Sequence, residues 1–318
     1  MRTVGPAAGG GGAGRPPGGG GSAPESAPGS APGSSGIRQA SLARIKEFGI
    51  APKRDLGQNF LIDDNILEVI LARLECRPDD VALEVGAGLG VLTDSLAGVA
   101  RHVHAFEVDR SLEAALRATL ADRSNVSLHL QDVLKARLEG LEPLPTVCAS
   151  NLPYSVAGPF IIESLQRLPG VRRYCVMVQR EVAERMAAAP GSRVYGVLSV
   201  WVQLYAEIRS VRRLARSIFY PQPHVDSSLV VLDRRPAGHT PAYDTSRLRD
   251  VIQAAFGQRR KMLVNSLSAG LSVPRAEALA WIEELGLPPD VRAERVEPDQ
   301  FVRIAERVGP RQGTRLER

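Results

Sequence analysis

Residues 150–154 read Ser-Asn-Leu-Pro-Tyr, and this short run combines three groups that can hold a flat ring bearing an amino group. Asn151 offers an amide oxygen that accepts a hydrogen bond from an exocyclic amine. Pro153 fixes the backbone and leaves a carbonyl nearby, and Tyr154 offers an aromatic face for stacking. Asn and Pro are also common where an ordinary strand enters a loop. The run alone leaves both interpretations open, and the upstream sequence decides between them.

Three further polar groups follow apolar segments that read as strands. The run 83–90, Leu-Glu-Val-Gly-Ala-Gly-Leu-Gly, is a strand entering a G-x-G-x-G turn, where glycines let the backbone approach a ligand closely. Glu107 ends the second strand and suits ribose hydroxyls, and Asp132 follows the third and suits an adenine amino group. With Asn151, four polar groups fall at the carboxyl ends of successive strands, where open parallel sheets bind ligands. Because no second phosphate cradle follows, S-adenosylmethionine is favoured over a dinucleotide as the cofactor.

The elements that position these groups alternate between strand and helix. We expect strands at 81–85, 103–107, 126–130, 146–150 and 174–179, and helices at 41–48, 65–74, 91–98, 111–120, 159–167, 181–188 and 196–206. Asp64 is expected to cap the helix 65–74. Segments 207–213 and 227–232 are expected to be the last two strands, in an antiparallel arrangement. Helices are expected at 245–256, 259–268, 275–285 and 298–307. The prediction is an α/β fold: a Rossmann-like class I methyltransferase sheet with a small C-terminal all-helical domain.

Length and composition suit a soluble, two-domain protein. The chain has 318 residues, of which 44% are apolar and 24% charged. Residues 1–36 are almost wholly Gly, Ala, Pro and Ser and are predicted to be a disordered tail. We expect the methyltransferase domain at 37–235 and a helical rRNA-binding domain at 242–318, with the boundary near 236–241. No apolar run or secretory signal favours a membrane, so a cytoplasmic location is expected. The three cysteines lack metal-ligand spacing, so no metal is expected.

The net charge of +5 is unevenly distributed. Residues 37–60 hold five basic residues against two acidic ones, and residues 209–235 hold six against two. Such patches suit a polyanionic partner, although a solvated charged face has the same composition. Candidate phosphate contacts are Lys53, Arg54, and the segments 209–216 and 258–261.

With these residues assembled, the chain resembles the KsgA family of ribosomal RNA adenine dimethyltransferases. The resemblance runs from about Leu56 to Phe301, with one departure at Ala87, where the family usually has Pro. It rests on seven runs in order: LGQNFL (56–61), EVGAGLG (84–90), NLPY (151–154), QREVAER (179–185), YGVLSV (195–200), FYPQPHVDS (219–227) and AFGQRRK (255–261).

The resemblance implies that two adjacent adenosines, in a hairpin loop near the 3′ end of small-subunit (16S) rRNA, are each methylated twice on N6. It implies S-adenosylmethionine as the cofactor, a pre-30S particle as the partner and a monomeric enzyme. The implied cofactor contacts are Asn59, Leu61, Gly86, Glu107, Asp132 and Asn151. The implied catalytic residues, which hold the target base, are Asn151, Leu152, Pro153 and Tyr154.

Three other functions fit parts of the same pattern. An Erm-type enzyme, which methylates 23S rRNA and confers macrolide resistance, commonly has Ile between Asn and Pro, so Leu152 argues against it. A ribosome-assembly factor that acts mainly by binding is disfavoured by the intact set of Glu107, Asp132 and residues 151–154. A DNA adenine methyltransferase is a weaker alternative, because such enzymes usually carry Pro-Pro-Tyr or a similar triplet.

Overall fold

The computed structural model of the protein describes residues 36–53, 55–236, 244–258 and 260–308. The disordered tail predicted at 1–36 lies outside the described residues up to residue 35, whereas Gly36 already belongs to helix α1 (Gly36–Glu47), which begins before the predicted Ser41. Most of the predicted boundary at 236–241 also lies outside them. By their contacts, the described residues from Gly36 onward belong to one compact unit. The division into domains at 37–235 and 242–318 therefore stays a prediction.

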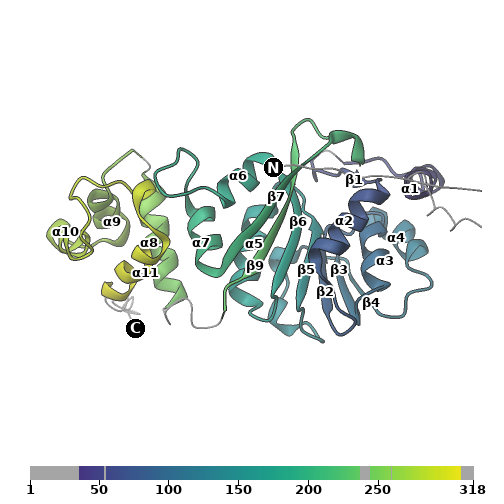
Figure 1. Cartoon of the computed structure of the whole chain (residues 1–318), viewed down its shortest axis with the longest axis horizontal. Helices are drawn as coiled ribbons and strands as arrows, with labels where there is room; N and C mark the ends of the chain where they lie inside the picture. The colour runs from purple at the N-terminus through teal and green to yellow at the C-terminus, as the bar shows by residue number, and fades with distance from the viewer. Residues whose placement is uncertain (1–35, 54, 237–243, 259, 309–318) are drawn as a thin grey trace, which may run out of the picture. The chain divides into compact units, whose positions relative to one another are not determined.

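A seven-stranded sheet with the order β4-β3-β2-β5-β6-β9-β7 forms the centre of the fold (Figure 1). The five parallel strands are β2 (Val81–Val85), β3 (His102–Phe106), β4 (Val126–His129), β5 (Val147–Asn151) and β6 (Arg173–Gln179). β9 (Ser227–Arg234) and β7 (Ala206–Leu214) complete it in antiparallel pairing. The predicted Rossmann-like sheet is confirmed, and the direction of the chain's progress across it reverses between β2 and β5, the place where such sheets bind ligands.

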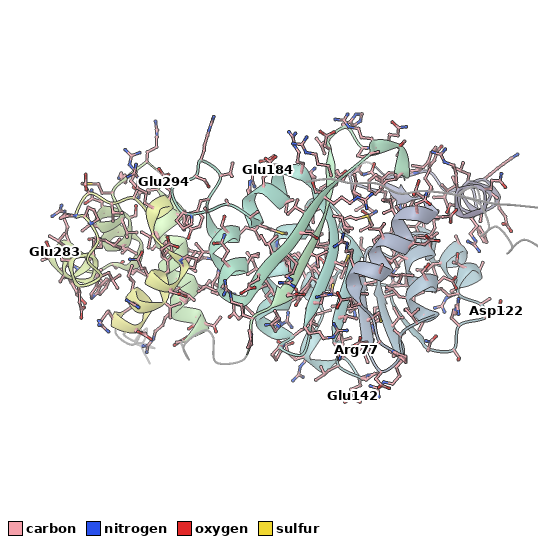
Figure 2. All side chains as sticks on the ribbon, in the orientation of Figure 1. Arg77, Asp122, Glu142, Glu184, Glu283 and Glu294 are labelled. Atoms are coloured by element: carbon pink, nitrogen blue, oxygen red, sulfur yellow. The ribbon has the colours of Figure 1, made fainter. Side chains whose placement is uncertain are left out.

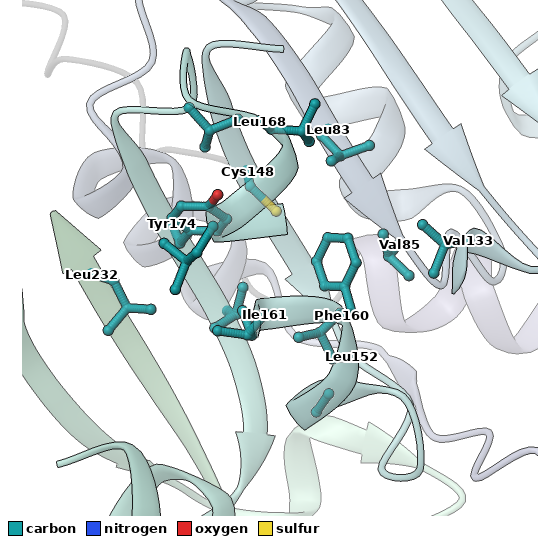
Figure 3. Packing of buried hydrophobic residues seen from close by; sticks show 14 of the residues in the cluster. Leu83, Val85, Val133, Cys148, Leu152, Phe160, Ile161, Leu168, Tyr174 and Leu232 are labelled. Atoms are coloured by element: carbon teal, nitrogen blue, oxygen red, sulfur yellow. The ribbon is translucent and has the colours of Figure 1, made fainter. Parts of the chain in front are cut away.

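Helices cover both faces of the sheet, which explains why its central strands are continuous apolar runs. One face is covered by α2 (Asp64–Leu74), α3 (Val91–Ala97) and α4 (Glu113–Thr119). The other is covered by α5 (Ala157–Arg167), α6 (Arg180–Met186) and α7 (Val197–Tyr205). Figure 3 shows this second core, where Phe160 and Ile161 of α5 pack beside Leu83, Cys148 and Leu152. Charged side chains such as Arg77, Asp122, Glu142 and Glu283 lie on the outside (Figure 2).

Two local predictions are corrected near the N-terminus. The cap of α2 is Asp63, not Asp64: the Asp63 carboxylate accepts from the Ile66 amide at 3.1 Å, and Asp64 is the first helical residue. A small antiparallel sheet of β1 (Phe60–Leu61) and β8 (Phe219–Tyr220) was not predicted. Its strands have two residues each, too few to show a period in the sequence.

The C-terminal part is helical as predicted, with α8 (Thr245–Gly257), α9 (Leu263–Leu271), α10 (Arg275–Glu284) and α11 (Pro298–Arg307). α9 begins at Leu263 rather than at 259, because the Lys261 amide donates to the Gln258 carbonyl and closes a turn there. Tyr195 and Trp201, which precede this part in sequence, are buried in its core. α7 thus contributes to two cores. No helix in the described ranges is both long and apolar enough to cross a membrane.

Candidate active site

Two adjoining cavities lie where β2 and β5 end. The larger has an empty volume of about 520 Å³ and the smaller about 330 Å³. Phe60, Gly86, Gly88 and Asn151 line both, so the cavities meet at these residues. The larger is also lined by Leu56, Gly57, Gln58, Asn59, Glu107, Val108, Leu152, Pro153, Tyr154 and Phe219. The smaller is also lined by Leu61, Glu84, Ala87, Leu89, Val91 and Leu92. Of the predicted site residues, all but Asp132 line one cavity or both.

The glycine turn uses backbone conformations with positive φ, which residues other than glycine rarely adopt. Gly86 and Gly88 have φ values of 80° and 57°. A Cβ on Gly86 would lie 3.1 Å from both the Asn151 carbonyl oxygen and Pro153 Cδ, and one on Gly88 would lie 3.1 Å from the Phe60 ring. The turn is therefore packed against residues 151–153 on one side and Phe60 on the other, and it presents bare backbone to the cavities.

Glu107 follows β3 and is held by the backbone of two neighbouring segments. Its Oε2 accepts from the Gly88 amide at 2.8 Å and its Oε1 from the Asp109 amide at 2.9 Å. Only 6% of the residue is exposed. Burial raises the pKa of this carboxyl, while the two amides oppose the rise. Because a carboxylate oxygen has more than one acceptor position, both oxygens can still accept from a ligand hydroxyl.

Asn151, the last residue of β5, is fixed by its amide nitrogen. Asn151 Nδ2 donates to the carbonyl oxygen of Asn59 at 2.8 Å, and Asn59 Nδ2 donates in turn to the Gly57 carbonyl at 3.0 Å. This bond uses one of the two N–H donors of the Asn151 amide and leaves the amide oxygen to accept. The side chain that the sequence predicts to be an acceptor is therefore held in one orientation.

The Pro153 carbonyl, which the sequence predicts to lie near the target amine, already accepts hydrogen bonds from the backbone. The Pro153 carbonyl accepts from the amides of Val156 and Ala157, at 3.0 and 3.1 Å, where α5 begins. It is occupied by the helix start and is a poor second acceptor. No backbone amide in the described ranges donates to the Leu152 carbonyl, while the Leu152 amide donates to Met177 at 3.0 Å. The Leu152 side chain is 2% exposed and packs in the core of Figure 3, which anchors the run.

The larger cavity has aromatic walls. Tyr154 is half-buried, and burial raises the pKa of its phenol, while a hydrogen bond with Ser227 opposes the rise. Phe219, on β8, lines the same cavity and is 3% exposed. Phe219 belongs to the run FYPQPHVDS (219–227), for which the sequence predicted no role in the site. Its position depends on the pairing of β1 with β8, which carries no sequence signal of its own.

Two predicted residues lie elsewhere or have other partners. Asp132 follows β4 but does not line either cavity; its carboxylate accepts from the Leu134 amide at 3.0 Å and caps a short 3-10 helix. Lys53, a candidate phosphate contact, places its ammonium 2.6 Å from the Asp109 carboxylate. Arg54 and Arg259 lie outside the described residues.

Beneath the glycine turn lies a buried carboxylic acid. Glu84 is 1% exposed, lines the smaller cavity and accepts a hydrogen bond from the Thr93 hydroxyl at 2.6 Å. Burial raises the pKa of Glu84 to about 8, against the effect of Thr93. At neutral pH this group is therefore mostly protonated.

A separate basic cavity was not predicted as a unit. It has an empty volume of about 1150 Å³ and is lined by Glu181, Arg185, Gly191, Ser192, Arg193, Val194, Arg260, Arg292 and Glu294. The cavity joins the loop after α6 to the helical part, because the Gly191 amide donates to the Glu294 carbonyl. Arg260 and Arg292 form no ion pair with the residues that the structure describes. Sequence reasoning missed it because the two arginine groups are far apart along the chain.

The arginines of the predicted 209–216 patch divide into two groups. Arg209 pairs with Asp233 at 3.0 Å and Arg216 with Asp226 at 2.7 Å. Arg212 and Arg213, on the edge strand β7, are exposed and form no ion pair within the described ranges. The patch thus holds two cations without a fixed carboxylate partner.

The residues around the cavities fit S-adenosylmethionine. A bare glycine turn, a buried carboxylate at the end of β3 and apolar walls from Phe60 and Val108 match a nucleoside with a charged tail. Among the described residues, no group of three or more His, Cys, Asp or Glu side chains is placed to hold a metal ion. A parallel Rossmann-like sheet with this site at its carboxyl edge defines a class I methyltransferase.

Comparison with known proteins narrows the class. A family model described as ribosomal RNA adenine dimethylase matches residues 50–309, and the chain belongs to this family. Its reaction is S-adenosylmethionine-dependent dimethylation of adenine in ribosomal RNA, and the protein is an enzyme of this kind. The ribosomal RNA small subunit methyltransferase A of Streptomyces coelicolor is 43% identical over 264 residues, which cover 81% of this chain and 91% of the relative.

Solved structures agree at the level of the fold. A dimethyladenosine transferase from Plasmodium falciparum superposes with a TM-score of 0.67 at 24% identity, covering 77% of this chain and 95% of that one. The 23S rRNA methyltransferase ErmE superposes with a TM-score of 0.57 at 28% identity, covering 78% and 99%. Its identity to this chain is lower than that of the Streptomyces small-subunit enzyme, in agreement with the preference drawn from Leu152.

Proposed function

We propose that this protein methylates, twice each, the N6 amino groups of two adjacent adenosines in the 3′-terminal hairpin loop of 16S rRNA during ribosome biogenesis. The observation that carries the proposal is the Asn151 amide, whose nitrogen is fixed on the Asn59 carbonyl and whose oxygen is left to accept. The 43% identity to a small-subunit methyltransferase over 81% of the chain supports the choice of rRNA.

Catalysis rests on positioning an amine that is a poor nucleophile. The lone pair of adenine N6 is delocalised into the ring, so acceptors that hold its two hydrogens favour a more tetrahedral, more nucleophilic nitrogen. We assign these acceptors to Asn151 Oδ1 and the Leu152 carbonyl, since the Pro153 carbonyl is occupied. Tyr154 stacks on the base, and Phe219 offers a second apolar face in the same cavity. The proton leaves to water, because the alkylated ammonium is acidic.

The cofactor side uses the remaining predicted residues. When bound, S-adenosylmethionine supplies an electrophilic methyl group on a sulfonium, so no metal or covalent nucleophile is required. Glu107 accepts from the ribose hydroxyls, and Asn59, Leu61 and Gly86 enclose the ligand at the two cavities. Asp132 accepts from the adenine amino group at the edge of the sheet, which requires its side chain to reach beyond the Leu134 amide that it now caps.

The partner is small-subunit rRNA in a pre-30S particle, bound by a cytoplasmic monomer. Arg212 and Arg213 beside the site, and Arg260 and Arg292 in the basic cavity, form no ion pair with the described residues, and they suit phosphates. The predicted helical rRNA-binding domain at 242–318 contributes Arg260 and Arg292.

One assay tests the substrate. The protein is mixed with labelled S-adenosylmethionine and with unmethylated small subunits, large subunits or free 16S rRNA, and the modified bases are mapped. We expect label on two adjacent adenosines of the 3′-terminal hairpin in small subunits. Label only in large-subunit rRNA would instead establish an Erm-type activity, and binding without label would establish an assembly factor.

A further inference from the structure

The segment 55–61, which we call the strap, forms one wall of the larger cavity. Five of its residues, Leu56 to Phe60, line that cavity opposite the glycine turn and Glu107. At its C-terminal end the strap is held by the Asn151 amide on the Asn59 carbonyl and by the pairing of β1 with β8. These contacts hold the strap on the side of the target base.

At its N-terminal end the strap is held by Asp109, which is 4% exposed. The Asp109 carboxylate accepts from the Lys53 ammonium at 2.6 Å and from Gln58 Nε2 at 2.7 Å. It also accepts from the Ser111 hydroxyl at 2.6 Å. Gln58 returns to Lys53, whose amide donates to Gln58 Oε1 at 2.8 Å. Three side chains therefore converge on one nearly buried carboxylate.

The same residue is joined to the cofactor carboxylate. The Asp109 amide donates to Glu107 Oε1 at 2.9 Å, and Glu107 Oε2 accepts from Gly88 at 2.8 Å. One continuous hydrogen-bonded chain thus runs from the strap through Asp109 and Glu107 to the glycine turn. Although burial opposes ionisation of Asp109, the hydrogen bonds from Lys53, Ser111 and Gln58 outweigh it and hold its pKa well below the usual range. The carboxylate is therefore charged at neutral pH.

We propose that Asp109 is a positioning residue for S-adenosylmethionine: its carboxylate latches the strap, through Lys53 and Gln58, against the loop that carries Glu107. The proposal rests on the proposed cofactor site and assigns no contact between Asp109 and the ligand. When the strap is held in this way, the cavity wall is ordered before the ligand arrives. The free energy of binding is then not reduced by the entropy of ordering the strap. Lys53 is then part of the cofactor site and not a phosphate contact.

The decisive experiment is the binding of S-adenosylmethionine to the full chain without RNA, measured by calorimetry. Asp109→Asn keeps the size of the side chain but removes the charge that holds Lys53 and turns one acceptor into a donor facing Gln58. We expect its dissociation constant to rise about tenfold, the effect of losing one or two charge-assisted hydrogen bonds. Lys53→Met should raise it a few-fold, and the double variant should be no worse than Asp109→Asn, because both changes break the same contact.

Asp80 supplies a matched control. It is 6% exposed and accepts from Arg172 at 2.6 Å, the Thr146 hydroxyl at 2.7 Å and the Arg77 amide at 2.7 Å, at the opposite edge of the sheet. Asp80→Asn should lower the melting temperature as Asp109→Asn does, yet leave the dissociation constant unchanged. Trypsin should cleave after Lys53 faster in Asp109→Asn than in Asp80→Asn, because only the former releases the strap.

Two outcomes overturn the proposal: Asp109→Asn binding S-adenosylmethionine within twofold of the wild type, or Asp80→Asn weakening the ligand as much. If Asp109→Asn does not fold, Lys53→Met and Gln58→Leu decide, and unchanged binding in both overturns it. Since no RNA is present, a wrong assignment of the RNA substrate leaves this result intact. Conversely, Asp109→Asn should bind S-adenosylmethionine weakly and still methylate 16S rRNA at the correct adenosines when the cofactor concentration is high. That result would show that Asp109 positions the cofactor and does not select the RNA substrate.

Discussion

The cofactor cavity and the basic cavity differ in how their charged groups are satisfied. Around the cofactor, Glu107 and Asp109 are nearly buried and each accepts several hydrogen bonds from the protein itself. In the basic cavity, Arg260 and Arg292 have no carboxylate partner among the described residues, and the space is more than twice as large. The first site is organised before its ligand arrives, whereas the second leaves cations for a polyanion to neutralise.

Because of this difference, the binding of S-adenosylmethionine and the binding of RNA should respond differently to salt. Contacts in a closed, hydrogen-bonded site are weakly screened by salt, while exposed cations facing phosphates lose affinity steeply as salt rises. Substitutions around the smaller ligand should therefore change cofactor binding or turnover at any salt concentration. Those in the basic cavity should change RNA binding in a salt-dependent way.

The largest expected effect is at Asn151, which lines both cavities of the active site. Asn151→Ala removes the acceptor for N6 and should lower kcat by about 10³-fold, the upper range for losing one preorganised polar group. Its dissociation constant for S-adenosylmethionine, measured by calorimetry, should change less than tenfold. Asn125→Ala is the control, because Asn125 Nδ2 also donates to backbone carbonyls, at 2.9 and 3.0 Å, but away from the site. Near-normal turnover in Asn151→Ala would remove this residue from the mechanism.

The residues behind this prediction could be read from the sequence because of where they fall. Gly86, Glu107 and Asn151 follow apolar strands, and the carboxyl ends of parallel strands meet at one edge. The position within the chain thus implied a position in space. Asp132 follows the same rule, but its side chain turned to the local backbone as a cap, a choice that strand order does not determine.

The features that could not be predicted depend on pairings between distant segments. β1 and β8 are two residues long and lie about 160 residues apart, so neither has a period or a turn to announce it. The basic cavity likewise brings Arg185 and Arg193 to Arg260 and Arg292. The basic run at 37–60 suits a polyanion or a solvated face and offers Lys53 as a candidate phosphate contact, yet Lys53 pairs with the buried carboxylate of Asp109. Composition gives the charge of a segment and leaves open the direction in which each side chain points.

A second prediction tests how far the cofactor cavity is organised in advance. Glu107→Ala leaves the Gly88 and Asp109 amides without their acceptor and removes the ribose contact. Losing charge-assisted hydrogen bonds to the ligand, each of about 1.5–3 kcal/mol, should give roughly 100-fold weaker binding of S-adenosylmethionine by calorimetry. Glu107→Gln keeps one acceptor oxygen, so its affinity for S-adenosylmethionine should lie between those of the wild type and Glu107→Ala. Equal loss in both variants would show that charge, rather than the hydrogen-bonded framework, dominates at this position.

A third prediction concerns the basic cavity. Arg260→Gln with Arg292→Gln should weaken binding to small subunits about tenfold at physiological salt and flatten the plot of log affinity against log salt by about 1.5, since each phosphate contact contributes 0.7–0.9. Binding of S-adenosylmethionine should stay unchanged. The control removes the same charge at the amino ends of the strands, with Arg77→Gln and Arg101→Gln; Arg77 is labelled in Figure 2. If both double variants flatten the slope equally, the cavity has no special role.

The smallest effect concerns the protonated acid under the glycine turn and is a change in stability with pH. Because the pKa of Glu84 is raised by burial to about 8, the folded state holds a proton that the unfolded state has released above its own pKa near 4.5. The stabilisation is complete below the unfolded value and decreases as pH rises to the folded one. Between pH 7 and pH 9 the free energy of unfolding should fall by roughly 1 kcal/mol because of this group.

Glu84→Gln isolates this contribution, because glutamine keeps an oxygen for the Thr93 hydroxyl and has no proton to lose. Urea unfolding at pH 7, 8 and 9 should give a stability difference between variant and wild type that grows in favour of the variant as pH rises. The thiol of Cys175, whose pKa is raised by burial and not by Glu84, affects both proteins equally and cancels in the difference. A difference that stays constant from pH 7 to pH 9 would mean that Glu84 is ionised throughout. The smaller cavity of the active site would then carry a negative charge at Glu84, and the partner of this charge would be the positively charged ligand itself.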